Sequence, residues 1–135
     1  MYNNILVPIA FDETGKVHPA IDVARTLAAP GAKITFLHVM ERVPPYAVSY
    51  LPADYIALTR ESILADLVQL AGQVPNGQAI VITGHSGRSI LDWLEENPTD
   101  LIVIASHRPG MQDLLLGSTA AKVVRHAQCA VHVIR

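Results

Sequence analysis

The segment from residue 106 to residue 119 combines residue types that suit the binding of an anion. Ser118 and Thr119 offer hydroxyl groups, Arg108 adds a fixed positive charge, and Gly117 lets a ligand approach the backbone closely. The segment ends where a helical pattern begins, and the free amides at a helix N-terminus attract negative charge. The segment is therefore a candidate phosphate cradle. It is not a P-loop, because no lysine follows Gly117 and the glycine spacing differs; a plain loop with Ser118 as the helix N-cap is the structural alternative.

Two further patterns resemble known sites, but each lacks an essential residue. Residues 84–88 read Gly-His-Ser-Gly-Arg, which is similar to a nucleophile elbow except that arginine replaces the last glycine. His126, Cys129 and His132 have the spacing of metal ligands, yet they run from a helix end into a strand, and the chain has no second cysteine. We therefore expect no catalytic residue and no metal site, with His126 interacting with a helix dipole instead.

The elements that would position these residues follow from the hydrophobic pattern. Five short apolar or β-branched runs predict strands at residues 4–9, 33–39, 79–83, 101–105 and 130–134. Between them, apolar residues recur every three or four positions, which predicts helices over residues 20–28, 63–74, 90–94 and 120–124. Strict alternation of strands and helices indicates an α/β fold, with an open parallel sheet covered by helices on both faces.

In such a sheet, ligands bind outside the carboxyl ends of the strands, where the direction of winding reverses. This rule directs attention to residues 8–14, after the first strand, and to residues 106–119, after the fourth. Residues 41–52 form the one long insertion, which includes two consecutive prolines. We expect an ordinary surface loop there, with a mobile flap as the alternative.

Composition limits the remaining possibilities. The 135 residues suit a single domain over 1–135, and a content of 50% apolar and 16% charged residues suits strands that are covered on both faces. The net charge of −2, without a dense basic block, argues against nucleic acid or an anionic membrane as a partner. No export signal or spanning apolar run is evident, and the single cysteine suits a reducing compartment, so we expect a cytoplasmic protein.

Two segments carry a resemblance to a known family. Residues 4–9 read Asn-Ile-Leu-Val-Pro-Ile, and residues 105–135 contain Ser-His-Arg-Pro, then Leu-Leu-Gly-Ser, then Val-Val-Arg-His-Ala-x-Cys. Together they resemble the universal stress protein family of UspA type, and in particular its bacterial F- and G-type branch. The family's phosphate motif is Gly-x2-Gly-x9-Gly-Ser/Thr. Here Ala105 replaces the first glycine, the second falls at Arg108 or Gly110, and the final Gly-Ser pair is kept.

The resemblance implies a Rossmann-like five-stranded sheet in the order 3-2-1-4-5, and a site for ATP or AMP. By this likeness the nucleoside would contact Pro8, Ile9, Ala10, Phe11 and Val39, and the phosphates would contact Ser106, His107, Arg108, Gly110, Gly117, Ser118 and Thr119. The family usually has an aspartate at the position of Ala10, where its carboxylate suits a nucleoside contact. Loss of a charge-assisted hydrogen bond there lowers affinity by about tenfold to a hundredfold.

The expected function is that of a stress-response, adenine-nucleotide-binding protein that acts as a dimeric signalling module. The resemblance implies a homodimer through the C-terminal strand 130–134, which lacks charge and proline, with higher oligomers and further protein partners in addition. Two alternatives stay open. One is a universal stress protein without ATP, acting as a structural or interaction module. The other is a slow ATPase or autophosphorylating enzyme, for which His107 is the only candidate general base.

Overall fold

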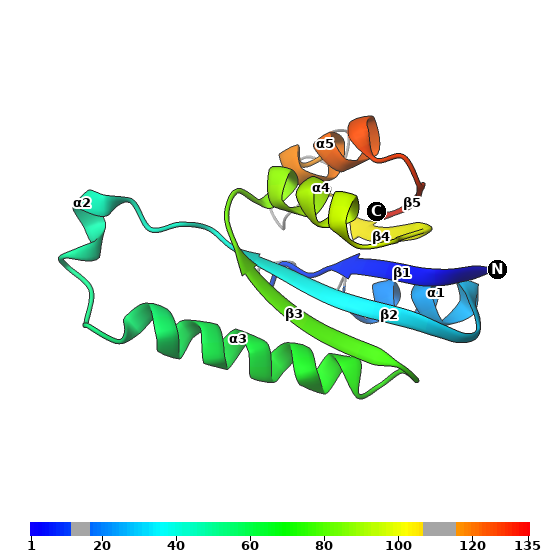
Figure 1. The fold of residues 1–135 in the computed structure, drawn as a ribbon, viewed down its shortest axis with the longest axis horizontal. Coiled ribbons are helices and arrows are strands. Elements are labelled where there is room, and N and C mark those ends of the chain that lie inside the picture. The colour runs from blue at the N-terminus through cyan, green and yellow to red at the C-terminus, as the bar shows by residue number, and fades with distance from the viewer. Residues whose placement is uncertain (12–16, 107–115) are drawn as a thin grey trace.

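The computed structural model of the chain describes residues 1–11, 17–106 and 116–135. Five parallel strands form one sheet in the order β3-β2-β1-β4-β5 (Figure 1). The strands are β1 (Tyr2–Pro8), β2 (Ala28–Met40), β3 (Gly77–Thr83), β4 (Leu101–Ala105) and β5 (Ala130–Ile134). The α/β class, the parallel pairing and the strand order predicted from the sequence are therefore confirmed.

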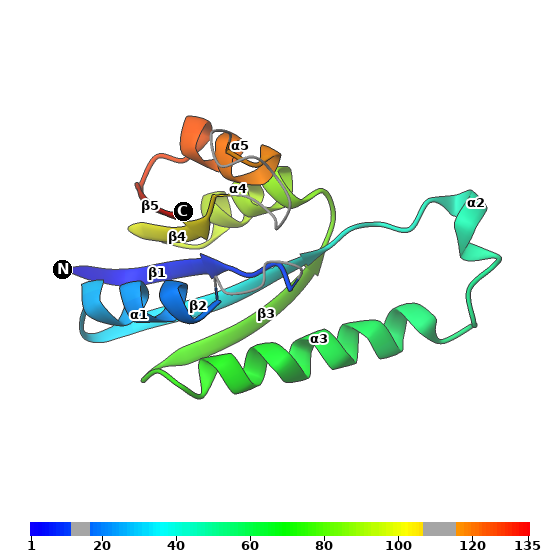
Figure 2. The same ribbon diagram turned by 180° about the vertical axis from the view of Figure 1, so that it is seen from behind.

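Helices cover both faces of this sheet. They are α1 (Val17–Leu27), α2 (Pro45–Val48), α3 (Tyr55–Ala71), α4 (Ser86–Glu96) and α5 (Ser118–His126). Figures 1 and 2 show α1 and α3 on one face of the sheet and α4 and α5 on the other. The four predicted helices are present. The short helix α2 is an addition, inside the segment 41–52 for which we expected only a loop.

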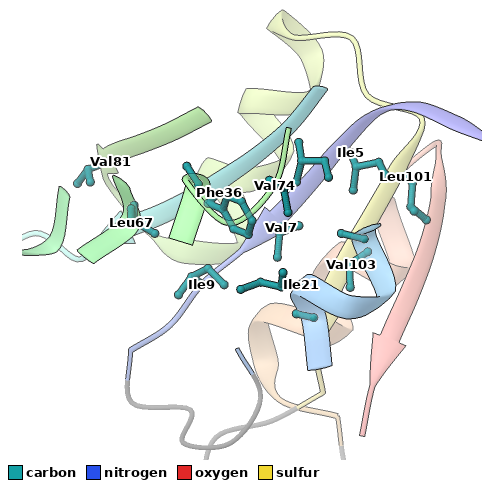
Figure 3. Close-up of a cluster of buried hydrophobic side chains, with 14 residues drawn as sticks. Ile5, Val7, Ile9, Ile21, Phe36, Leu67, Val74, Val81, Leu101 and Val103 are labelled. Carbon is teal, nitrogen blue, oxygen red and sulfur yellow. The ribbon is translucent and has the colours of Figure 1, made fainter. Parts of the chain in front are cut away.

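The core consists of two apolar clusters, one on each side of the sheet. The first lies between the sheet and the helices α1 and α3, where Val7, Phe36 and Ile21 are almost completely buried (Figure 3). The second lies between the sheet and the helices α4 and α5, and includes Leu6 and Leu37. Successive side chains of a strand point to opposite faces, so each central strand supplies both clusters. This explains why these strands read as continuous apolar runs.

Two residues that were predicted to be helical lie outside the helices. Ala28, placed in the first helix, is the first residue of β2, because α1 ends at Leu27 and the chain passes directly into the strand. Val74, placed in the second helix, lies beyond the end of α3 at Ala71 and is nevertheless buried. Its helical spacing therefore reflects burial in the first cluster, since a residue can complete an apolar face from the turn that follows a helix.

The segment formed by α2 and the first turns of α3 extends beyond the carboxyl ends of the strands (Figures 1 and 2). The buried residues of α3, Leu67 and Ala71, both lie in its second half. Arg60 ties the first half to β3, because its guanidinium donates hydrogen bonds of 2.6 Å to the Val81 carbonyl and 3.2 Å to the Thr83 hydroxyl. The helix is thus held beside the carboxyl edge of the sheet.

Candidate functional site

A cavity of about 800 Å³ opens at the carboxyl ends of β1, β2 and β4. This is where the winding of the sheet reverses and where open α/β sheets bind ligands. Most of the residues predicted for the site line it, namely Pro8, Ile9, Ala10, Phe11, Val39, Ser106, Gly117, Ser118 and Thr119. His107, Arg108 and Gly110 lie outside the described residues. The volume is in the range that small-molecule ligands occupy in proteins.

The first wall of the cavity is the segment that follows β1. Ile9 continues the sheet by one residue, since its amide donates a 2.8 Å hydrogen bond to the Leu37 carbonyl. The Ile9 carbonyl accepts a 2.7 Å hydrogen bond from Nδ1 of His38, whose ring lies 5.4 Å from the ring of Phe11. Sequence reasoning missed His38. The available signal was a histidine within the mainly apolar run 34–40, next to the predicted site residue Val39.

The second wall joins the end of β4 to the start of α5. Ser106 is 3% exposed, and its amide donates a 2.7 Å hydrogen bond to the carbonyl of Ile134. The Ser106 carbonyl accepts a 2.5 Å hydrogen bond from the Gly117 amide, which brings Gly117 back to the end of β4. Gly117 is the N-cap of α5, not Ser118 as the structural alternative supposed. Because Ser118 is the first residue of the helix itself, its hydroxyl is placed at the cavity.

A third contribution comes from the start of α4, which sequence reasoning did not assign to this site. Ser86 is the first residue of α4 and lines the cavity. Its Oγ lies 2.6 Å from Oγ1 of Thr119, so the first turns of α4 and α5 meet at the same end of the cavity. The amides of both helix termini carry partial positive charge, which favours an anionic group at this end.

The family model named "Universal stress protein family" matches residues 1–135. The chain belongs to the universal stress protein family. It is 33% identical to a universal stress protein of Thermus aquaticus, over the whole length of both chains. It is also 30% identical, over the whole of both chains, to Universal stress protein G of Salmonella typhimurium, which confirms the predicted likeness to the G-type branch.

Solved structures of this family share the fold. A universal stress protein from Lactobacillus plantarum is 27% identical, with a TM-score of 0.74 over 99% of this chain and 98% of that one. A universal stress protein in complex with cAMP is 16% identical, with a TM-score of 0.72 over 99% and 97% of the two chains. An Arabidopsis thaliana family member with AMP bound is 18% identical, with a TM-score of 0.64 over 98% and 90%.

In this universal stress protein two acidic side chains also line the cavity. Glu41, just after β2, and Asp66, on α3, both line the cavity and are exposed to solvent. Neither was predicted from the sequence, because neither α3 nor the segment after β2 had a known relation to the cavity. Two carboxylates disfavour an anion beside them, whereas the N-termini of α4 and α5 favour one. The site therefore suits a ligand with one anionic end and one end that donates hydrogen bonds.

The residues with the spacing of metal ligands, His126, Cys129 and His132, do not line this cavity. His126 is the last residue of α5, at the negative end of the helix dipole as expected. Cys129 is half-buried against the second apolar cluster, and this burial raises the pKa of its thiol. Within residues 1–11, 17–106 and 116–135, no group of three or more His, Cys, Asp or Glu side chains is placed to hold a metal ion.

None of the helices in the described part of the chain has the length and apolar character needed to cross a membrane.

Proposed function

We propose that this universal stress protein binds an adenine nucleotide, ATP or AMP, in the cavity at the carboxyl edge of the sheet. The observation that carries the proposal is the pairing of an apolar wall with the N-termini of α4 and α5 around one cavity. The base and ribose would contact the wall formed by Ile9, Phe11 and Val39, and the phosphates would lie near Ser118 and Thr119. Family members of the same fold, in complex with cAMP and with AMP, support an adenosine phosphate as the ligand.

Calorimetric titration of the purified protein with ATP, AMP and adenosine tests this proposal. We expect saturable binding of at least one of the two nucleotides. The variant Ser118→Glu places a carboxylate in the first turn of α5, where it favours the helix but repels phosphate. We expect it to weaken nucleotide binding by about tenfold or more, as for the loss of a charge-assisted contact.

Ser62→Glu is the matched control, since Ser62 is exposed on α3 and does not line the cavity. Its nucleotide affinity should equal that of the wild type. The absence of nucleotide binding by the wild-type protein would refute the proposal and favour the second candidate, a structural or interaction module without ATP. The observation that favours this second candidate is Ala10, which cannot supply the carboxylate that the family usually has there.

We further propose that the protein acts as a homodimeric signalling module paired through β5. Among the strands of the described residues, this one is at the edge of the sheet and pairs only with β4, which supports a role in association. Its residues carry no charged side chain and no proline, so its outer edge is a suitable template for a second copy. We propose a cytoplasmic location for this dimer, supported by the single cysteine, Cys129, which is free.

A further inference from the structure

His38 makes two separate contacts with the short segment that follows β1. Its Nδ1 lies 2.7 Å from the carbonyl oxygen of Ile9. Its ring lies 5.4 Å from the ring of Phe11, with an angle of 47° between the two planes. Both partners line the cavity, as does His38 itself. One half-buried side chain of β2 therefore contacts two of the three residues, Ile9 to Phe11, that form the first wall.

The hydrogen bond between Nδ1 of His38 and the Ile9 carbonyl shows which nitrogen of the ring carries a proton. A carbonyl oxygen only accepts hydrogen bonds, so Nδ1 of His38 must carry the proton and donate it. In the neutral imidazole the other nitrogen, Nε2, is then an acceptor without a proton. The hydrogen bond thus selects one tautomer of His38, which is a property that can be measured without any ligand.

Within the described residues, the anchoring of this segment decreases along the chain, from Ile9, which is buried in the first apolar cluster, to the exposed Phe11. The strand β1 ends at Pro8, and Ile9 adds one backbone hydrogen bond to Leu37. The next residue, Ala10, has only a methyl group, so it supplies no polar anchor of its own. Phe11 is 40% exposed, and within the described residues its ring contacts the ring of His38.

We propose that His38 is a positioning residue, which fixes the Ile9 to Phe11 wall in the geometry that receives the base and ribose of the ligand. The inference rests on the proposed nucleotide site and adds the residue that preorganises its base-binding side. When the wall is held before binding, the ligand does not have to order it, and affinity is correspondingly higher. The phosphate end of the cavity lies on α4 and α5 and does not depend on this contact.

Two variants separate the two contacts of His38. His38→Asn keeps an N–H donor near the position of Nδ1 but removes the ring, whereas His38→Phe keeps a ring but removes the donor. His126→Ala is the control, because His126 is exposed at the end of α5 and does not line the cavity. Without ligand, the imidazole nitrogen shifts of His38 are measured in the wild type and in His126→Ala, and the amide resonances of Ala10 and Phe11 are compared in all the proteins by NMR.

We expect the wild-type protein to show the Nδ1–H tautomer of His38. His38→Phe should shift the amide resonances of Ala10 and Phe11, and His38→Asn should restore them in part. We expect His38→Phe to bind ATP and adenosine about tenfold more weakly than the wild type, which is the effect of one buried hydrogen bond and of the order it imposes. His38→Asn should recover about half of that loss on a logarithmic scale. Binding of inorganic tripolyphosphate should change by less than about twofold, because this ligand does not reach the wall.

Three outcomes would overturn the inference. They are an Nε2–H tautomer in the wild type, unchanged amide resonances in His38→Phe, and equal losses of affinity for ATP and tripolyphosphate. Failure of the wild-type protein to bind any adenine nucleotide would instead refute the proposed function. In that case the tautomer and the amide resonances still decide whether His38 fixes the wall, so the two failures are distinguishable.

Discussion

Ser86 and Thr119 lie 33 residues apart in the sequence, and their hydroxyl oxygens are 2.6 Å apart at the cavity. Each is in the first turn of its helix, so the hydrogen bond joins the N-termini of α4 and α5. The two helices also pack closely further along, because a Cβ atom added to Gly87 would lie 3.0 Å from Cδ of Lys122. The part of the cavity that favours an anion is therefore formed by the N-termini of two helices, and not by the loop before α5 alone.

Loss of this hydroxyl pair should weaken both the fold and the site. We predict that Ser86→Ala lowers the free energy of unfolding by about 0.5–1.5 kcal/mol, the net contribution of one hydrogen bond. It should also reduce ATP affinity by about threefold to tenfold, because the Thr119 hydroxyl loses the partner that orients it. Urea denaturation and calorimetry measure the two effects. Ser62→Ala, on the exposed surface of α3, is the control, and an equal ATP affinity in Ser86→Ala and this control would contradict the role in the site.

The position of Ala10 offers a test by gain of affinity. It lines the cavity directly between Ile9 and Phe11 and is only half-buried, so a larger side chain has space beside it. We predict that Ala10→Asp tightens the binding of ATP and adenosine by about tenfold, because a carboxylate accepts hydrogen bonds from the nucleoside. Asparagine has a similar shape to aspartate but no charge, so calorimetry on Ala10→Asn separates the effect of the charge on affinity from the effect of the shape. Unchanged or weaker binding by Ala10→Asp would show that a carboxylate at position 10 makes no contact with the ligand.

The proposed dimer depends on which amides of β5 face outward. The Ile134 carbonyl accepts from the Ser106 amide, so Ile134 faces β4. Backbone groups of alternate residues along a strand point the same way, so His132 also faces β4, whereas Val131 and Val133 present theirs at the free edge. A proline at 132 would therefore break the pairing within one copy. A proline at 131 removes an outward donor instead.

We therefore predict that Val131→Pro shifts the protein from dimer to monomer in light scattering, with the circular dichroism of the fold retained. Val131→Ala is the matched control, since it shortens the same side chain and keeps the amide, and it should remain dimeric. His132→Pro should lose stability by about 1 kcal/mol or more, because it removes a hydrogen bond of the sheet. A wild-type protein that is monomeric at micromolar concentrations would end the proposal of a β5 dimer.

The turn between α3 and β3 allows a prediction on stability. Asn76 has a positive φ of 57°, and a Cβ atom added to Gly77 would collide with the backbone carbonyl of Ala71. A backbone atom cannot rotate away, so we predict that Gly77→Ala lowers the free energy of unfolding by about 1–3 kcal/mol. Gly72→Ala is the control in the same turn. Its added Cβ would meet only ordinary contacts of 3.5 and 3.6 Å, and its φ of −67° suits alanine, so stability should be unchanged or slightly higher. Urea denaturation of both variants measures these changes in the free energy of unfolding.

Much of this architecture is encoded locally, and the sequence by itself determined it. The continuous apolar runs, the helical spacing and the strict alternation predict a doubly covered parallel sheet, because each pattern reflects burial of one element. The loops after β1 and β4 were identified as parts of one site by the same reasoning, since parallel strands bring their carboxyl ends to a common edge. The family likeness supplied the strand order, which periodicity alone does not contain.

Only the tertiary structure decided which distant residues complete the site. Asp66 carries no local signal for binding, because it lies in a helix whose pattern reflects only packing. His38 and Ser86 do carry local signals, a polar residue in an apolar run and a Gly-His-Ser-Gly sequence, but these signals do not indicate that the two residues reach this cavity. Asp66 and Ser86 lie on the crossover helices α3 and α4, whose final positions depend on how these helices pack against the sheet, whereas His38 lies on β2. The outward direction of the Val131 amide is decided in the same way, since it follows from the register between β4 and β5. Contacts between residues far apart in the chain depend on how the helices and strands pack together, and the local sequence pattern does not contain this information.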